Sequence, residues 1–304
     1  MKDYTPSQMR NIALVGHGSS GKTSLTAALL FDAGAVSRLT KVEKGNTVTD
    51  YEPEEIDRKI SISSAVCFLE WKDHKLNLVD TPGYSNFLWD TKASLRAVDA
   101  AAVVIDAVAG VEVGTEKVWE MLEEYRLPRV FVINKLDREN ANFKRTLDIV
   151  RESFGREAVP VQLPIGEEKN FSGVYDLLQG KAFLFDKDES GKFKEGEVPA
   201  GLKAEADKAR EAMMEMVAES DEKLMEKFFE KGTLTPQEFS SGLKKSVAAR
   251  QIFPVFVCSA LQNIGLQLFL DGLVEYLPSP QERLDVKAMV KDQEATIKPS
   301  PDEP

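Results

Sequence analysis

One eight-residue segment limits the possible folds of this chain more than any other feature. The segment GHGSSGKT at residues 16–23 follows a short apolar run directly, and a helical pattern begins at Lys22. This is the G-x-x-x-x-G-K-S/T pattern of a phosphate-binding loop, in the strand–loop–helix setting that such a loop requires. With glycine at ~7% of residues, a chance match in a chain of this length is on the order of 1%. The sequence therefore predicts a phosphate-binding domain built on a strand followed by a helix.

Short apolar runs recur along the chain and alternate with helical patterns. Uninterrupted apolar runs are typical of parallel strands covered on both faces, and strand–helix alternation gives right-handed crossovers between them. We therefore expect an α/β fold, a P-loop NTPase three-layer domain with a mostly parallel sheet, in which a hairpin at residues 69–76 adds one antiparallel pair. The expected strands are residues 12–15, 76–79, 100–105, 130–133 and 253–257, and the expected helices between them are residues 22–32, 86–96, 115–125, 143–154 and 265–276.

The pattern changes near Pro164 and resumes at Phe253. Between these points, short strands punctuated by glycine precede charged helical stretches at residues 202–230 and 236–250. After residue 277 the chain is rich in proline and charge, which is typical of a linker or a disordered end. We expect a nucleotide-binding domain at residues 1–163 and 252–280, an inserted α+β subdomain at residues 164–251, and a linker or disordered tail at residues 281–304.

The phosphate-binding loop and the strand end after it carry the chemistry of a nucleotide–metal site. Glycines let backbone N–H groups converge on a β-phosphate, and the start of the following helix adds a favourable dipole. We expect Lys22 to place its charge on the β- and γ-oxygens and the Thr23 hydroxyl to bind Mg²⁺. The segment DTPG at residues 80–83 ends a strand, where Asp80 can reach the same metal and the Gly83 amide can contact the γ-phosphate.

A later strand end predicts which base is bound. The segment NKLD at residues 134–137 follows the strand at residues 130–133. The Asp137 carboxylate can accept hydrogen bonds from guanine N1–H and the exocyclic amine, which adenine does not present in that arrangement. A buried acceptor left unpaired costs about 1–3 kcal/mol, so we expect GTP to bind and ATP to be rejected.

The other residues at these strand ends complete the predicted nucleotide site. We expect Asn134 to tie the base-binding loop to the phosphate loop, the Lys135 stem to lie against the base, and the Ala260 amide to reach guanine O6. All four segments lie at carboxyl ends of strands, where open α/β sheets bind ligands. The expected cofactors are GTP or GDP with Mg²⁺. The predicted GTP-binding residues are Gly16, His17, Gly18, Ser19, Ser20, Gly21, Lys22, Thr23, Ser24, Asp80, Asn134, Lys135, Asp137, Ser259, Ala260 and Leu261.

Several longer segments carry a family resemblance. They are the GH that opens the phosphate loop, DYEPEEIDRKISI at residues 50–62, DTPG at 80–83 and NKLDR at 134–138. QLPIG at residues 162–166, LMEK at 224–227 and YLPSP at 276–280 extend the likeness over nearly the whole chain. With these segments the chain resembles the translational GTPases, and among them the elongation factor G family most closely. The segments QLPIG and LMEK are similar to that family's subdomain inserted in its GTP-binding domain.

The resemblance implies a Mg²⁺-dependent GTPase whose hydrolysis is stimulated by the ribosome, acting in translational elongation, either in translocation or in recycling. It implies contacts with the large ribosomal subunit and its stalk protein. It also places one switch segment at residues 50–62 and a second from Asp80, both ordered by the γ-phosphate and Mg²⁺. Ser61 stands where the family has a metal-binding threonine. The predicted metal ligands are Thr23, Ser61 and Asp80.

Three residues depart from the family's pattern. Tyr84 follows DTPG where the family has a histidine that positions the attacking water. A phenol stays protonated at neutral pH and cannot act as a base, although it can hydrogen-bond a water molecule. Gly18 replaces an aliphatic residue and Ser19 replaces an aspartate in the phosphate loop. The predicted catalytic residues are Lys22, Gly83 and Tyr84, and the rate of hydrolysis stays open.

Two alternative functions share these motifs. The Tyr84 departure favours a GTP/GDP-binding switch with little hydrolysis, and a release-factor or ribosomal-protection translational GTPase carries the same motif set. A P-loop kinase or ATPase disagrees with the base-binding segment at residues 134–137.

Charge and hydropathy limit the partners. The net charge of -11 excludes a general nucleic-acid coat, because such affinity comes from Lys and Arg neutralising phosphates. We therefore expect no DNA binding and only local contacts with ribosomal RNA. No apolar stretch of about 18 residues and no apolar signal region after the N-terminus occur. We expect a cytoplasmic monomer that does not bind membranes.

Overall fold

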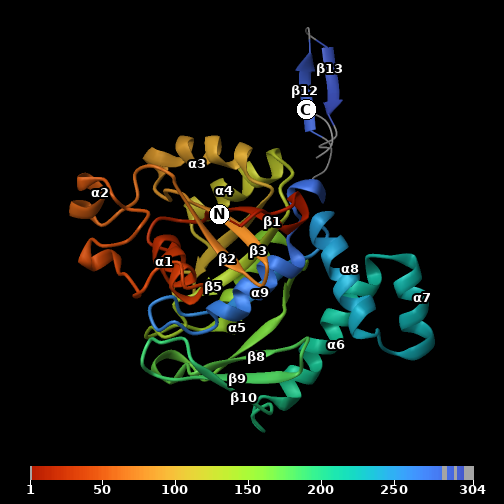
Figure 1. Ribbon diagram of the computed structural model, residues 1–304. Coiled ribbons are helices and arrows are strands. Elements are labelled where there is room, and N and C mark those ends of the chain that lie inside the picture. The colour runs from red at the N-terminus through yellow and green to blue at the C-terminus, as the bar shows by residue number, and fades with distance from the viewer. Residues whose placement is uncertain (1, 283–285, 291–292, 298–304) are drawn as a thin grey trace.

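The computed structural model describes residues 2–282, 286–290 and 293–297. Its centre is a seven-stranded sheet in the order β2-β3-β1-β4-β5-β11-β6 (Figure 1). Only β2 runs antiparallel to its neighbour, β3, through the hairpin expected from the sequence. This is the predicted mostly parallel α/β sheet. Its strands are β1 (Met9–Val15), β2 (Ala65–Trp71), β3 (His74–Asp80), β4 (Ala100–Asp106), β5 (Arg129–Asn134), β6 (Ala158–Pro160) and β11 (Phe253–Val257).

Helices cover the sheet and account for its apolar strands. Every residue of β4, β5 and β11 is buried, as expected for strands with helices on both faces. Helices α1 and α9 contact each other, and α4 and α5 share an aromatic cluster with β5. The helices around this sheet are α1 (Lys22–Asp32), α2 (Pro53–Arg58), α3 (Leu88–Ser94), α4 (Val113–Glu124), α5 (Phe143–Phe154) and α9 (Leu266–Tyr276), and short 3-10 helices are Pro6–Gln8, Val42–Lys44, Ser85–Phe87, Leu95–Ala97, Glu168–Asn170 and Pro280–Glu282.

The aromatic cluster fixes α4 and α5 on the sheet. The Trp119 ring stacks on Phe154 with centroids 4.4 Å apart and on Phe131 at 5.4 Å. The buried Arg129 guanidinium lies 4.2 Å from the Trp119 ring centroid and pairs with Glu123 at 2.7 Å. Ring–ring and cation–ring contacts of this kind add to the burial of apolar area. The cluster therefore fixes β5 against α4 and α5.

Residues between β6 and β11 build a second, antiparallel sheet and three helices. The helical stretch expected at residues 202–230 is divided into α6 and α7, because the Asp221 carboxylate accepts the Lys223 and Leu224 amides at 2.9 and 3.3 Å and so starts a new helix. The predicted domain boundaries after residues 163 and 251 stay predictions. The elements are β7 (Gln162–Ile165), β8 (Gly173–Asp176), β9 (Lys181–Phe185), β10 (Phe193–Gly196), α6 (Lys203–Glu219), α7 (Glu222–Lys231) and α8 (Pro236–Ala248).

Part of the expected tail is folded. In residues 281–304, predicted as a linker or disordered tail, the structure describes an antiparallel pair of strands, β12 (Val286–Val290) and β13 (Gln293–Ile297). Proline is absent from residues 286–297, so no missing N–H interrupts the pairing. The composition that suggested a linker is concentrated on either side of this pair of strands. The rest of the tail lies outside the described residues.

No helix within the described part of the chain combines the length and the apolar character that crossing a bilayer requires.

Replacing Phe131 by alanine should lower the free energy of unfolding by about 3–5 kcal/mol, because it leaves a cavity in a fully buried site. Urea unfolding followed by circular dichroism measures this change. The Val113→Ala variant, at a position 60% exposed on α4, should stay within about 0.5 kcal/mol of the parent. Equal losses in both variants would contradict the packing described for β5.

Candidate nucleotide-binding site

Most of the segments singled out in the sequence meet around one cavity at the carboxyl ends of the strands. The cavity has a volume of about 340 Å³ and is lined by the phosphate loop, Asp50, Ser61, Tyr84 and Lys135. Ala260 and Leu261 line a small neighbouring hollow, which Ser24 shares with the main cavity. Gly83 lines the main cavity, whereas His17, Asp80, Asn134, Asp137 and Ser259 are not among its lining residues.

Gly21 joins the phosphate loop to α1. Gly21, the residue before α1, has a φ of 97°, a conformation that favours glycine. A Cβ atom there would also collide with the Asn134 amide. The loop amides therefore lie at the N-terminus of α1, where an anion is stabilised.

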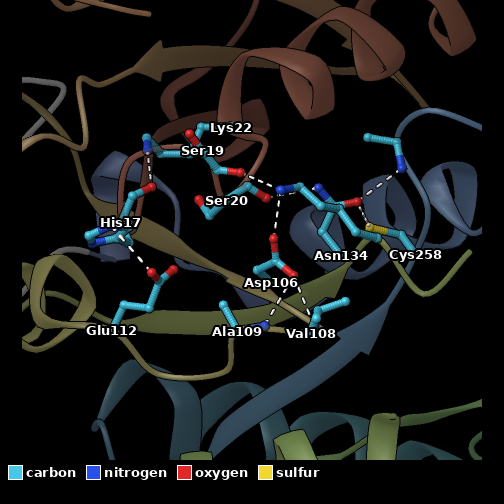
Figure 2. Close-up of polar contacts among 12 residues, drawn as sticks. His17, Ser19, Ser20, Lys22, Asp106, Val108, Ala109, Glu112, Asn134 and Cys258 are labelled. Atoms are coloured by element: carbon cyan, nitrogen blue, oxygen red, sulfur yellow. Dashed lines mark hydrogen bonds and ion pairs between the residues drawn. The ribbon is translucent and has the colours of Figure 1, made fainter. Parts of the chain in front are cut away.

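Lys22 is held beneath this loop. Its Nζ donates to the carbonyl oxygen of His17 at 2.9 Å (Figure 2). It also donates to the carbonyl oxygen of Gly16 at 3.1 Å. The side chain is buried, and this burial lowers the pKa of Lys22 to about 8 against the attraction of Asp80 and Asp50. A buried ammonium with only neutral direct acceptors is stabilised by an anion that approaches it. The position suits the phosphates of a nucleotide.

Hydroxyl and carboxylate groups gather beside Lys22. Thr23 Oγ1 lies 3.0 Å from Ser61 Oγ, which donates to Asp50 Oδ1 at 2.8 Å. Asp80 Oδ2 accepts from Thr49 Oγ1 at 2.7 Å, while its buried Oδ1 has no hydrogen-bond partner among the described residues. Burial raises the pKa of Asp80 to about 6, although Thr49 and Lys22 oppose the rise.

This set fits a hard divalent cation. Mg²⁺ takes oxygen ligands and keeps several waters, so two hydroxyls and a nearby carboxylate suffice. An orphaned buried carboxylate oxygen is the group that such a cation would stabilise. In the described part of the chain, no cluster of three or more His, Cys, Asp or Glu side chains offers an alternative metal site. Thr49 and Asp50 were not among the predicted residues, although Asp50 opens the segment assigned to the first switch.

Asn134 joins the phosphate loop to the base-binding loops. Its Nδ2 donates to Ser20 O at 3.1 Å, and its Oδ1 accepts from the Ala260 amide at 3.0 Å and from Cys258 Sγ at 3.5 Å (Figure 2). Next to it, Asp137 Oδ1 accepts from Ser259 Oγ at 2.5 Å. One side chain thus connects the ends of β1, β5 and β11.

Lys135 is fixed by a carboxylate that sequence reasoning missed. Lys135 Nζ lies 2.6 Å from Asp106 Oδ2 and also donates to Ser19 O. Asp106 Oδ1 accepts from the Val108 amide at 2.9 Å and more weakly from that of Ala109 (Figure 2). Burial opposes ionisation, but Lys135 and these amides lower the pKa of Asp106. The sequence did contain a signal for a site residue at Asp106, because Asp106 ends an apolar strand as Asp80 and Asn134 do.

The three residues that depart from the family pattern, Gly18, Ser19 and Tyr84, lie in contact with one another. Tyr84 Oη lies 2.8 Å from Ser19 Oγ. The Tyr84 ring lies over Gly18, where a Cβ atom would approach the ring to 2.7 Å. An aliphatic side chain at position 18 would therefore displace the ring. The small residues of this loop and the phenol at position 84 fit each other.

His17 is not among the residues that line the cavity. Its Nε2 lies 3.4 Å from Glu112 Oε1 (Figure 2). Its Nδ1 accepts from the Gly114 amide at 3.2 Å. The ring therefore connects the phosphate loop to the start of α4.

Replacing Asn134 by alanine should lower the free energy of unfolding by about 1–3 kcal/mol, because it leaves the Ala260 amide and the Ser20 carbonyl without their partner. Urea unfolding in the absence of nucleotide measures the effect. Gln237→Ala on α8 changes an exposed amide and should stay within about 0.5 kcal/mol. Unchanged stability in the Asn134 variant would show that this side chain does not connect the loops.

Comparison with known proteins identifies this arrangement of motifs. A family model described as the elongation factor Tu GTP binding domain matches residues 7–279. A crystal structure of a protein from Thermus thermophilus is similar, with a TM-score of 0.86 at 36% sequence identity, over 91% of this chain and 41% of the Thermus chain. The chain thus spans less than half the length of that relative. The resemblance expected from the sequence is confirmed: this chain belongs to the elongation factor Tu GTP-binding domain family.

Proposed function

We propose that this chain is the Mg²⁺-dependent GTPase domain of an elongation-factor-G-like protein that acts on the ribosome during elongation, in translocation or recycling. The observation that carries the proposal is the convergence of Lys22, Asn134 and Asp137 at one edge of the sheet. In this proposal residues 1–163 and 252–280 bind the nucleotide and residues 164–251 form an inserted subdomain.

The phosphate end of the site would neutralise and orient the triphosphate. Lys22 would exchange its contacts with the Gly16 and His17 carbonyls for phosphate oxygens. The attraction so gained in a buried position is stronger than it would be in water. Gly83, which lies against Lys22 and the phosphate loop, would offer its amide to the γ-phosphate.

Thr23, Ser61 and Asp80 would hold Mg²⁺ beside these phosphates. When bound, the cation supplies charge stabilisation for the oxygens of the transferred phosphoryl group. Asp50 would hold the Ser61 hydroxyl through the 2.8 Å hydrogen bond between them. Thr49, already bonded to Asp80, would place the first switch segment next to the metal.

Base recognition would rest on Asp137. The Ser259 hydroxyl occupies Asp137 Oδ1 and so orients the carboxylate for two donors of the guanine edge. Lys135, held by Asp106 and Ser19, would cover one face of the base. The Ala260 amide is bonded to Asn134, which sets the loop that would approach guanine O6.

Two versions of this function differ in the role of Tyr84. In the first, the phenol leaves Ser19 when GTP is bound and hydrogen-bonds the attacking water, which gives a ribosome-stimulated GTPase. In the second, its 2.8 Å contact with Ser19 persists, and the chain is a GTP/GDP switch with little hydrolysis. The contact with Ser19 is the specific observation that favours the second candidate.

The Asp137→Asn variant should lose GTP affinity by about tenfold or more and gain affinity for xanthosine triphosphate, because an acceptor becomes a donor. Equilibrium titration with fluorescent nucleotide analogues measures both affinities. Asp148→Asn, at an exposed position on α5, should leave both unchanged. An unaltered preference for GTP in the Asp137 variant would refute the proposed base recognition.

The Tyr84→Phe variant should lower the ribosome-stimulated kcat about 10²-fold while GDP affinity changes by less than about twofold, since only the hydroxyl that orients water is lost. Phosphate release with and without ribosomes measures this. Tyr125→Phe, which removes a hydroxyl from a tyrosine at the end of α4, is the matched control and should keep full activity. Absence of stimulation in the parent protein would favour the switch over the GTPase.

A further inference from the structure

A second cavity lies away from the nucleotide site, where α9 meets the segment inserted between β6 and β11. It has a volume of about 410 Å³ and shares no lining residue with the nucleotide cavity. Much of its wall is apolar and includes Phe239, Phe256 and Leu268. Cavities that hold organic ligands measure about 300–1,000 Å³ and combine apolar walls with few polar groups. The size and wall of this cavity therefore suit one small organic molecule.

Three carboxylates also line the cavity, and only one of them has a cationic partner. Asp271 pairs with Lys72 Nζ at 2.7 Å and accepts from Trp71 Nε1 at 2.8 Å. Glu275 accepts from the neutral Ser240 hydroxyl at 2.7 Å. Arg210 lines the cavity too, but in the described part of the chain it forms no ion pair with any of these acids. The cavity thus carries excess negative charge.

Asp176 is a buried acid in this cavity, with only 8% of the residue exposed. Oδ1 accepts the Leu178 and Gln179 amides at 2.9 and 2.8 Å, whereas no described residue donates to the other carboxylate oxygen. Burial, with Glu275 and Asp271 nearby, raises the pKa of Asp176 to about 6. A buried carboxylate without a cationic partner is costly, and a ligand that brings a positive charge relieves that cost.

We propose that this cavity binds a small organic cation, an amine with an apolar body. Its ammonium group donates to Asp176 and Glu275, which have acceptor capacity and no cation of their own. Its apolar body lies against Phe239, Phe256 and Leu268. An anion would meet three carboxylates against the single Arg210 guanidinium and is therefore disfavoured. A neutral molecule of the same shape gains only the apolar contacts.

The three probes that test this proposal share one skeleton. They are 4-phenylbutylamine, 4-phenylbutanol and 4-phenylbutyrate, which carry a positive, a neutral and a negative end group. Isothermal titration calorimetry on the whole chain at pH 7.5, with and without saturating GDP, measures their affinities. The amine should bind at least about tenfold more tightly than the alcohol, and the carboxylate should bind most weakly. Equal affinities of amine and alcohol, or no binding of the amine, would overturn the proposal.

Two variants locate the site. Asp176→Asn keeps an oxygen acceptor for the Leu178 and Gln179 amides but removes the charge, and should weaken amine binding about tenfold. Glu275→Gln should weaken it in the same direction and serves if the first variant does not fold. The exposed Glu120→Gln on α4 is the matched control and should bind the amine like the parent. Parent-like amine affinity in both cavity variants would refute the site, whatever their nucleotide affinity.

Discussion

The carboxamide of Asn134 is the interaction on which the geometry of the site depends. It bonds the Ser20 carbonyl in the phosphate loop and the Ala260 amide in the loop after β11, so the two ends of the predicted nucleotide pocket share one rigid connector. The parallel sheet makes this possible, because it brings strand ends that are far apart in sequence to the same edge. The helices that bury β4, β5 and β11 from both faces hold that edge in place.

Two buried charged groups at this edge of the sheet, Lys22 and Asp80, are incompletely paired within the protein. Burial lowers the pKa of Lys22 and raises that of Asp80, because in each case the neighbours of the charged group do not compensate for the loss of water. A nucleotide phosphate beside the first group and a divalent cation beside the second would provide the missing compensation. The same reasoning applies to Asp176 in the second cavity, where three carboxylates meet apolar walls. Incomplete pairing of buried charge is thus the shared property of both candidate binding sites.

Sequence alone predicted the segments in which a short motif stands directly at the end of a predicted strand. The phosphate loop, the acidic end of β3 and the segment after β5 are short, directional and fixed by strand ends, so their residues could be named in advance. Asp106 could have been found by the same rule, but its partner Lys135 is 29 residues away and only the fold brings them together. Thr49 gave no sequence signal, because its hydroxyl gains meaning only beside Asp80. The break between α6 and α7 and the pairing of β12 with β13 were missed because a local cap and the absence of proline outweighed the composition around them.

The central claim is that one edge of the sheet binds guanine nucleotides in preference to adenine nucleotides. Competition between GTP and ATP for the whole chain, measured at equilibrium with and without Mg²⁺, tests it most directly. The account predicts that GTP binds about 5- to 150-fold more tightly than ATP, since ATP leaves the Asp137 carboxylate unpaired at a cost of about 1–3 kcal/mol. It also predicts that Mg²⁺ strengthens GTP binding. Equal affinity for the two nucleotides, or tighter binding of ATP, would contradict it.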